Sequence, residues 1–194
     1  MQGPTLDCEL GHFFKLAGAR EIMATNDREQ MVKPDFMSEE DWEGLKNATA
    51  SLDRIRGDAK ADVARYLANP EGWSTGKGSP SGLPTLLLTM VGRKSGKEHT
   101  TPLVFLQDGD NMVVVASLAG YDAAPAWHLN LMANPECWVQ CDHKRMRAIA
   151  HDASPEERAA LWPRLVAMFP TWGYFQSQTD RPFGIVILTP TASA

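Results

Sequence analysis

Residues 101–117 read TPLVFLQDGDNMVVVAS, and this stretch decides the fold. Its first seven residues have the apolar composition of a strand, and Asp108-Gly109 is a strong signal for a tight hairpin turn. The run from Asn111 to Ser117 then returns as a second strand that is apolar on both faces. We therefore expect a β-hairpin whose second strand lies in the centre of a sheet.

The other strand patterns also favour an antiparallel arrangement. A short helix is expected at 126–133, and a capping box predicts another from Ser154, which Pro163 either kinks or replaces with a new helix. A doubly wound parallel sheet would alternate strands with helices, whereas here hairpin-linked strands dominate. The pattern predicts an α+β protein, a small and mainly antiparallel barrel with flanking helices. The further strands are expected at 85–91, 136–142, 145–152 and 183–189.

The N-terminal region has a helical pattern instead. Residues 1–37 show weak periodicity, so their structure is left open. Ser38 followed by three acidic residues predicts a helix start, and apolar residues continue at helical spacing over 42–55. We expect Gly57 to interrupt this helix and Asp58 to cap a second one.

A change in composition separates this region from the barrel. Residues 69–84 are rich in Gly, Ser and Pro, which predicts a linker. We therefore divide the chain into residues 1–80, an N-terminal helical extension with its linker, and residues 81–194, the barrel. The extension either covers an opening of the barrel or forms a seam between two copies, so a monomer and a homodimer are both open.

Composition excludes several classes of protein. The chain has 194 residues, a formal net charge of -5 and a pI of about 5.5, which argues against nucleic-acid binding. Three cysteines make no disulfide framework, the histidines are too scattered for a metal site, and no apolar run is long enough to span a bilayer. A cytoplasmic protein is the simplest interpretation. Residues 12–16, HFFKL, belong either to a loosely ordered leader or to an amphipathic helix that touches the inner face of a membrane.

The segment GRKSGK at 92–97 is the most distinctive local motif. It lies between two expected strands, and its two glycines allow a ligand to approach the backbone closely. Ser95 and exposed amides can donate hydrogen bonds, while Arg93, Lys94 and Lys97 supply positive charge, a combination that suits phosphate. The alternative is a solvated basic turn. The segment is not a Walker P-loop, because only three residues separate its glycines.

Two further segments are candidates for a binding pocket. Residues 117–120, SLAG, leave room for a flat ring against the backbone, although an ordinary strand-ending turn fits equally well. Trp127 either walls a pocket or belongs to the core. The aromatic run FPTWGYF at 169–175 is broken by Pro170 and Gly173, so we expect no regular helical stripe there. It either lines an apolar substrate pocket or plugs one end of the barrel.

Taken in order, these motifs resemble the deazaflavin-dependent nitroreductase family, a class of F420H2-dependent oxidoreductases of mycobacteria and other actinobacteria. The resemblance covers about residues 83–190. It is carried by GRKSG at 92–96, TPL at 101–103, DGD at 108–110, VAS at 115–117, PAWHLNLMANP at 125–135, EER at 156–158, WP at 162–163, QS at 176–177 and TDR at 179–181.

The resemblance implies a split β-barrel of the FMN-binding type, with coenzyme F420 in a groove beside the barrel. The basic loop would hold the phosphate, and residues 116–120 with Trp127 and Asn130 would border the deazaflavin ring. The coenzyme-binding candidates are Arg93, Lys94, Ser95, Gly96, Lys97, His99, Thr101, Pro102, Ala116, Ser117, Leu118, Ala119, Gly120, Pro125, Trp127 and Asn130. The substrate-binding candidates are Val104, Phe169, Trp172, Tyr174 and Phe175.

The activity that the resemblance implies is hydride transfer from reduced F420 to an electron-poor apolar acceptor: an activated enone, a quinone or a nitro compound. Tyr174, His128 or water would supply a proton, and backbone amides near Ser117 would stabilise negative charge. Glu98-His99 and Leu118-Ala119 replace residues that include cations in the family pattern, and the pocket has lost tyrosine hydroxyls. The alternatives are an FMN-dependent oxidoreductase of the same fold and a non-catalytic carrier of F420 or another small ligand.

Overall fold

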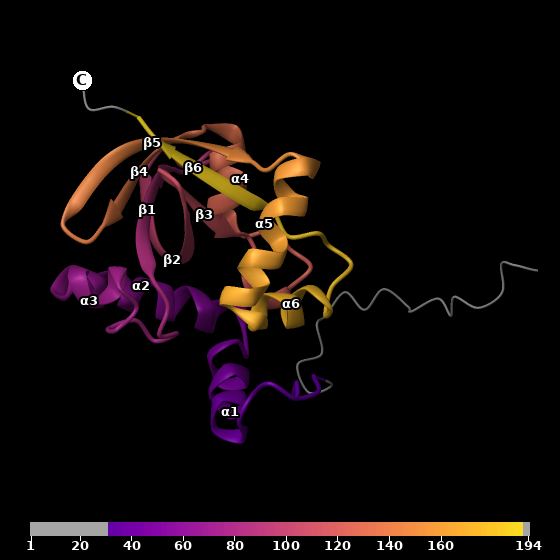
Figure 1. Cartoon of the computed structure of the whole chain (residues 1–194). Coiled ribbons are helices and arrows are strands. Elements are labelled where there is room, and N and C mark those ends of the chain that lie inside the picture. Colours follow the sequence, from indigo (N-terminus) through magenta and orange to yellow (C-terminus); the bar gives the residue numbers. More distant parts are fainter. Residues whose placement is uncertain (1–30, 192–194) are drawn as a thin grey trace, which may run out of the picture.

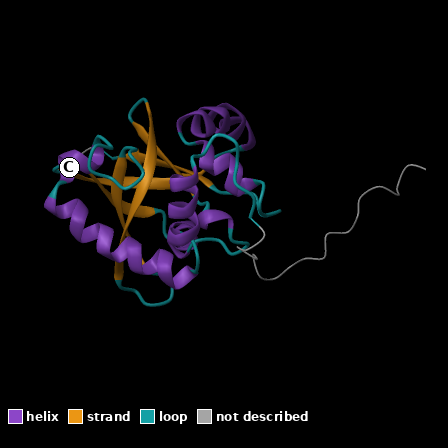
Figure 2. Ribbon diagram, turned by 90° about the horizontal axis from the view of Figure 1, so that it is seen from below, coloured by secondary structure: helices purple, strands orange, loops and turns teal. Residues whose placement is uncertain are grey.

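The computed structural model describes residues 31–191. Figure 1 shows its strands gathered into a barrel, and Figure 2 shows helices around the outside of the strands. The predicted α+β class with flanking helices is confirmed. The elements are α1 (Glu39–Ala48), α2 (Leu52–Ala68), α3 (Pro70–Ser74), β1 (Thr85–Val91), β2 (Glu98–Asp108), β3 (Asn111–Val115), the 3-10 helix η2 (Leu118–Gly120), α4 (Ala126–Ala133), β4 (Glu136–Cys141), β5 (Lys144–Asp152), α5 (Pro155–Met168), α6 (Pro170–Gln176) and β6 (Ile185–Pro190).

The sheet closes on itself in the order β1-β2-β3-β6-β5-β4, and every neighbouring pair is antiparallel. Three of these pairings are not hairpins. β1 meets β4 around Thr89 and Trp138, β3 meets β6 around Val113 and Ile187, and β5 meets β6 across two intervening helices. Closure gives every strand two neighbours, although residues 98–104 of β2 pair only with β1.

The strand β3 is buried on both faces, as its sequence predicts. Met112 and Val114 point into the barrel, where all six strands contribute apolar side chains to one core. Val113 and Val115 point outward into a second core beneath α5 and α6, which we call the outer cluster. The strand therefore joins the barrel interior to the helical layer that covers it.

Two-residue turns close both predicted hairpins. Asp108 pairs with Asn111, and Gly109 between them has a φ of +59°. Asp142 and His143 form the corresponding turn between β4 and β5, with Asp142 at a φ of +57°. Positive φ at such positions matches the right-handed twist of the strands that the turn connects.

The break between the first two helices differs from the prediction. It lies at residues 49–51, whereas Gly57 is accommodated inside α2. The Thr49 hydroxyl donates to the Leu45 carbonyl at 2.8 Å, and the Ser51 hydroxyl accepts from the Arg54 N–H at 3.1 Å. Capping by Ser51 satisfies a free amide of the first turn, and this outweighs the modest cost of one helical glycine.

The segment predicted as a linker contains the short helix α3. Asn69 caps this helix by accepting from the Gly72 N–H at 3.1 Å. Trp73 is buried against Tyr66 of α2 and Leu87 of β1. The region before the barrel is therefore packed onto it.

The C-terminal helices decide one open alternative and correct one expectation. α5 begins at the predicted capping box, but Pro163 lies inside it and starts no new helix. The aromatic run at 169–175 forms the helix α6 despite its proline and glycine. Pro170 stands in the first turn, where a helix has no use for the missing N–H, and the helix ends soon after Gly173.

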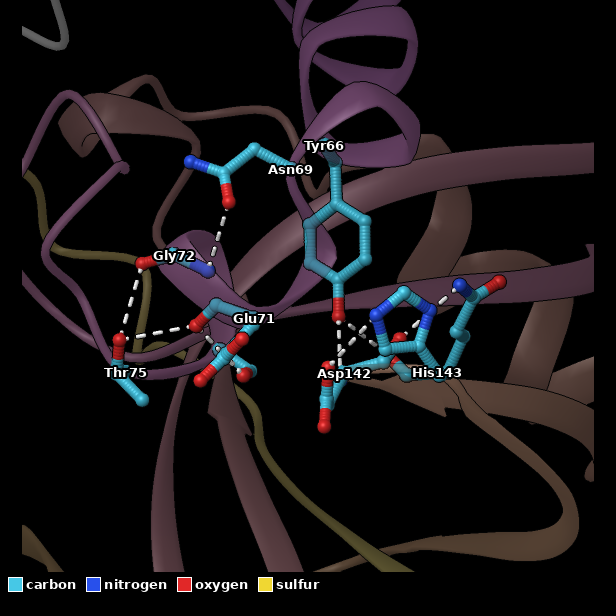
Figure 3. A network of polar contacts seen from close by, with 9 residues as sticks. Tyr66, Asn69, Glu71, Gly72, Thr75, Asp142 and His143 are labelled. Atoms are coloured by element: carbon cyan, nitrogen blue, oxygen red, sulfur yellow. Dashed lines mark hydrogen bonds and ion pairs between the residues drawn. The ribbon is translucent and has the colours of Figure 1, made fainter.

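Tyr66 links α2 to the β4–β5 hairpin of the barrel (Figure 3). Its hydroxyl donates to the Gln140 carbonyl at 3.1 Å and accepts from the Asp142 N–H at 3.0 Å, and the residue is completely buried. Burial raises the pKa of Tyr66 to about 12, with the charges of Cys141 and Asp142 contributing. One side chain thus satisfies both a carbonyl and an amide of the β4–β5 turn.

We expect Tyr66→Phe to lower the free energy of unfolding by about 1–3 kcal/mol, because two backbone groups lose their partner. Urea denaturation at neutral pH measures this. Above pH 10 the difference in free energy of unfolding between the wild type and Tyr66→Phe should narrow. In the wild type, Tyr66 ionises in the unfolded state while it stays neutral in the folded state, so the wild type loses stability as the pH rises toward 12.

The matched control is Arg56→Gln on the same helix. Arg56 makes an exposed ion pair with Asp53, and the side chains are 71% and 94% exposed. Such a pair contributes about 0–1 kcal/mol, so the control should unfold close to the wild type. Equal stability of Tyr66→Phe and the wild type would contradict the anchoring role.

Candidate functional site

The turn between β1 and β2 is the predicted phosphate loop, residues 92–97. The Gly92 N–H donates to the Lys97 carbonyl and the Gly96 N–H to the Gly92 carbonyl, both at 2.8 Å. A Cβ on the buried Gly92 would lie 2.6 Å from Ser95 Oγ and 2.7 Å from His99 Nε2. The loop is a tight turn with internal hydrogen bonds.

Asn130 on α4 holds this loop against the barrel. Its Oδ1 accepts from the Arg93 backbone N–H at 3.2 Å and from the Arg93 Nη1 at 2.9 Å, and Asn130 is 7% exposed. The resemblance places Asn130 beside the coenzyme ring. That placement stays a prediction; the observed contacts turn the side-chain carbonyl of Asn130 toward the loop, where it positions Arg93.

The cations of the loop face solvent. Lys94 and Lys97 are exposed, and within residues 31–191 neither forms an ion pair. The Ser95 hydroxyl lies 3.2 Å from His99 Nε2, and it accepts from the Lys97 N–H at 3.3 Å. Unpaired cations and a hydroxyl on a tight turn suit an oxyanion with several oxygens, such as phosphate.

The segment after β3, the predicted ring site, has a strained backbone. Leu118, Ala119 and Gly120 have φ values of +44°, +52° and +79°. Left-handed backbone costs free energy at the two non-glycine positions. A Cβ on the buried Gly120 would lie 2.9 Å from the carbonyl oxygen of Phe175. This close approach brings the predicted ring site against α6, which carries most of the predicted substrate residues.

Arg181 holds this strained segment, a role that no local sequence pattern indicates. Its guanidinium donates to the carbonyls of Ala116 at 3.0 Å, Ser117 at 2.9 Å and Tyr121 at 3.0 and 3.2 Å. Burial lowers the pKa of this guanidinium, and the Asp122 carboxylate acts in the opposite direction. The sequence presents Arg181 only as part of a family motif.

His128, a predicted proton donor, is paired with a carboxylate. Its Nε2 lies 2.8 and 3.0 Å from the two oxygens of Asp152. Its buried Nδ1 has no hydrogen-bond partner in the described part of the chain. A Cβ on Gly184 would lie 2.6 Å from the ring. The pair ties α4 to the end of β5, and proton donation to an acceptor stays a prediction.

The predicted substrate residues lie together in the outer cluster. Trp172 and Phe175 are buried there, whereas Val104, Phe169 and Tyr174 are partly exposed. Trp172 and Phe175 therefore form the floor of the cluster, and the other three residues are partly accessible, although the hydroxyl oxygen of Tyr174 is itself buried.

The helix α1 also lies against this cluster. The rings of Trp42 and Tyr174 pack edge to face with centroids 5.9 Å apart. The Tyr121 hydroxyl donates to the Thr49 carbonyl at the end of α1, at 3.1 Å. The contacts of Trp42 support a covering role for α1 on the side of the predicted substrate residues.

The remaining candidates flank these features. Thr101 and Pro102 lie on β2 after the loop, Pro125 precedes α4, and Trp127 is partly buried against the barrel core. Which of them contact the coenzyme stays a prediction. Within residues 31–191, no three metal-ligating side chains form a cluster, and no helix has the length and hydropathy needed to cross a bilayer.

Comparison with known proteins gives a consistent family. The model of the family described as F420H(2)-dependent quinone reductase matches residues 60–190. A Mycobacterium tuberculosis protein with the provisional name of an F420H(2)-dependent quinone reductase is 41% identical over 115 residues, covering 59% of this chain and 97% of the relative. A second protein of that organism, named F420H(2)-dependent quinone reductase, is 36% identical over 114 residues. The match covers 57% of this chain and 76% of that relative.

Two solved structures share the barrel. One, described as an F420-H2 dependent reductase, has a TM-score of 0.51 and 33% identity, and the match covers 54% of this chain and 93% of that one. The other, described as a domain-swapped dimer, has a TM-score of 0.51 and 29% identity. The match covers 67% of this chain and 99% of that one. The split β-barrel that the resemblance implies is confirmed.

We expect Asn130→Ala to loosen the loop without unfolding the barrel. The substitution removes two hydrogen bonds to Arg93, each contributing about 0.5–1.5 kcal/mol. Amide hydrogen exchange at Arg93 should accelerate at least tenfold, which mass spectrometry of the peptide over 92–97 detects. The control is Asn134→Ala, which removes a side-chain bond to the Glu136 N–H beyond the other end of α4. Equal exchange rates in the two variants would refute the positioning role.

Proposed function

The chain belongs to the F420H(2)-dependent quinone reductase family, and on this premise we propose that it transfers a hydride from reduced coenzyme F420 to an apolar quinone. The chain is accordingly an oxidoreductase. The observation that carries the proposal is the family match over residues 60–190, because that range contains the basic loop, α4, the segment after β3, and α6.

The basic loop fits the phosphate-bearing part of such a coenzyme. Lys94, Lys97 and the Ser95 hydroxyl are available as donors, and Arg93 has guanidinium N–H groups beyond the one that Asn130 holds. Charged hydrogen bonds of this kind contribute about 1.5–3 kcal/mol each. Asn130 contributes indirectly, since it fixes the direction in which Arg93 leaves the loop.

When it is bound, coenzyme F420 supplies the hydride and its electron pair. The residues of the chain bind the coenzyme and the acceptor and orient them relative to each other. The loop at 92–97 anchors the phosphate, the segment 116–120 borders the ring, and the partly exposed Phe169 and Tyr174 exclude water on the acceptor side. Orientation of this kind removes the entropic cost of bringing the two reactants together.

We propose a quinone as the acceptor, with enones and nitro compounds as comparison substrates. The outer cluster offers aromatic faces, and at the positions of Val104, Phe169, Trp172 and Phe175 it offers no hydroxyl group. Such a surface suits a planar, apolar ring. Tyr174 and water are the proposed proton sources, with His128 restricted by its pairing with Asp152.

The assembly, the domain division and the location are part of the same proposal. A related structure is described as a domain-swapped dimer, which supports the homodimer as one of the two predicted states. The division at residue 80 stays a prediction, and the family match itself begins at residue 60, inside α2. The predicted membrane contact of residues 12–16 lies outside the described residues, and the cytoplasmic location stays a prediction.

We expect Arg93→Ala combined with Lys94→Ala to raise the Kd for F420 at least tenfold. The two substitutions remove charged donors from the phosphate loop, and tenfold corresponds to about 1.4 kcal/mol. Fluorescence titration of the purified protein measures the Kd, with FMN titrated in parallel. The matched control is Arg145→Ala with Arg147→Ala, which removes the same charge from guanidiniums 4.8 and 5.1 Å from the Trp138 ring on the barrel surface.

The control variant should bind F420 within about twofold of the wild type, since it leaves the loop intact. Turnover with quinones, enones and nitro compounds then identifies the acceptor class. Binding of FMN alone would replace the coenzyme, and F420 binding without turnover of any acceptor would favour the carrier alternative. An unchanged Kd in the loop variant would reject the phosphate assignment.

A further inference from the structure

Two consecutive backbone amides after β3 have no acceptor. The N–H groups of Ser117 and Leu118 form no hydrogen bond with any group in residues 31–191, although both residues are partly buried. Backbone donors in such positions are normally paired within the protein or with a ligand or water. These two donors lie in the segment that packs against α6, next to the predicted acceptor site.

The backbone conformation points the two donors at one place. Ser117 is right-handed, with φ -77° and ψ -38°, and Leu118 has a left-handed φ of +44°. A right-handed residue followed by a left-handed one turns successive N–H groups toward a common point, and the resulting concave nest binds anions. We call residues 117–118 the amide nest.

Arg181 determines which way the nest faces. Its Nη1 and Nη2 hold the carbonyls of Ala116 and Ser117. In a trans peptide the carbonyl and the following N–H point in opposite directions. Because Arg181 draws both carbonyls to one side, the N–H groups of Ser117 and Leu118 point to the other. The guanidinium charge also polarises both peptide groups and strengthens them as donors.

Arg181 is itself held rigidly. Its N–H donates to Thr179 Oγ1 at 3.1 Å, its carbonyl accepts from Gln176 Nε2 at 2.9 Å, and its guanidinium lies 5.0 Å from the Phe183 ring. The Thr179 hydroxyl donates to Asp122 at 2.6 Å, which joins this segment again to the chain after the nest. The nest is therefore formed before any ligand arrives.

We propose that Arg181 is a positioning residue that preorganises the amide nest, and that the nest binds the negative oxygen of the quinone as it is reduced. This inference rests on the proposed function. The hydride carries two electrons to the quinone, which becomes the hydroquinone monoanion and then takes one proton from water. The coenzyme is oxidised and releases one proton, so charge and protons balance. Donors fixed in advance at a developing oxyanion lower the barrier to its formation.

The direct test is an NMR titration of the 15N-labelled protein with 4-nitrophenolate, an anionic stand-in for the hydroquinone monoanion. In the wild type, the amide protons of Ser117 and Leu118 should shift downfield as phenolate binds. The shifts should be lost in Arg181→Met and partly kept in Arg181→Lys. Ser117→Pro removes one donor directly, and its φ of -77° is within the range of proline, so this variant decides the question if Arg181→Met fails to fold.

Steady-state kinetics provide the second readout. Arg181→Met and Ser117→Pro should lower kcat for quinone reduction at least tenfold, measured at saturating F420, while KM for the quinone changes less than threefold. The matched control is Arg158→Met. The Nη1 of Arg158 donates to the Phe183 carbonyl and its guanidinium stacks on Trp162, so the control disturbs the same segment without touching the nest. Its kcat should stay close to that of the wild type.

Two results overturn the inference: phenolate leaves the two amides unshifted in the wild type, or kcat survives in both Arg181→Met and Ser117→Pro. Failure of the proposed function looks different. A wild type that reduces no quinone but shows the phenolate shifts would retain the anion-binding nest and reject the quinone. A wild type that reduces quinones without these shifts would retain the function and reject the nest.

Discussion

Two antiparallel closures of the barrel determine where every part of the candidate site lies. In the β1–β4 pairing, Met90 near the end of β1 lies opposite Cys137 near the start of β4. The residues just after β1 and just before β4 must therefore meet, and Arg93 contacts Asn130 there. In the β3–β6 pairing, Val115 lies opposite Ile185, so the residues after β3 meet those before β6. Arg181 and the amide nest come together by the same geometry.

The local signals of the sequence predicted the elements but not these closures. Asp108-Gly109, the capping box at Ser154 and the alternation of apolar residues act over a few residues, and the strands they predict are confirmed. Where local signals compete, the weaker one gives the wrong prediction: Gly57 indicates a break although Ser51 caps the helix, and Pro170 indicates a disruption although it stands in a first turn. A proline or glycine changes a helix only according to its position in it.

The same distinction separates the parts of the site. The basic loop was predictable, because its charges and glycines are adjacent in the chain. The contacts of Asn130 and Arg181 were not predictable, because they join residues far apart in the chain. Asn130 lies 37 positions from Arg93, and Arg181 lies 64 positions from Ser117 and 65 from Ala116. An asparagine in an apolar helix and an arginine before a strand show no local pattern that distinguishes a positioning role. Such roles follow from the register of the closed sheet, which local patterns in the sequence do not indicate.

The two ends of the site are also connected to each other. Gly184 accepts from the Ala116 N–H at 2.8 Å and lies under the ring of His128. His128 is on α4, the helix whose Asn130 holds the basic loop, and its pairing with Asp152 fixes that helix to β5. The separation between the loop and the nest is thus set by packing within the protein. A coenzyme that bridges them would have to match a fixed distance between its phosphate and its ring, and the protein pays no reorganisation to present that distance.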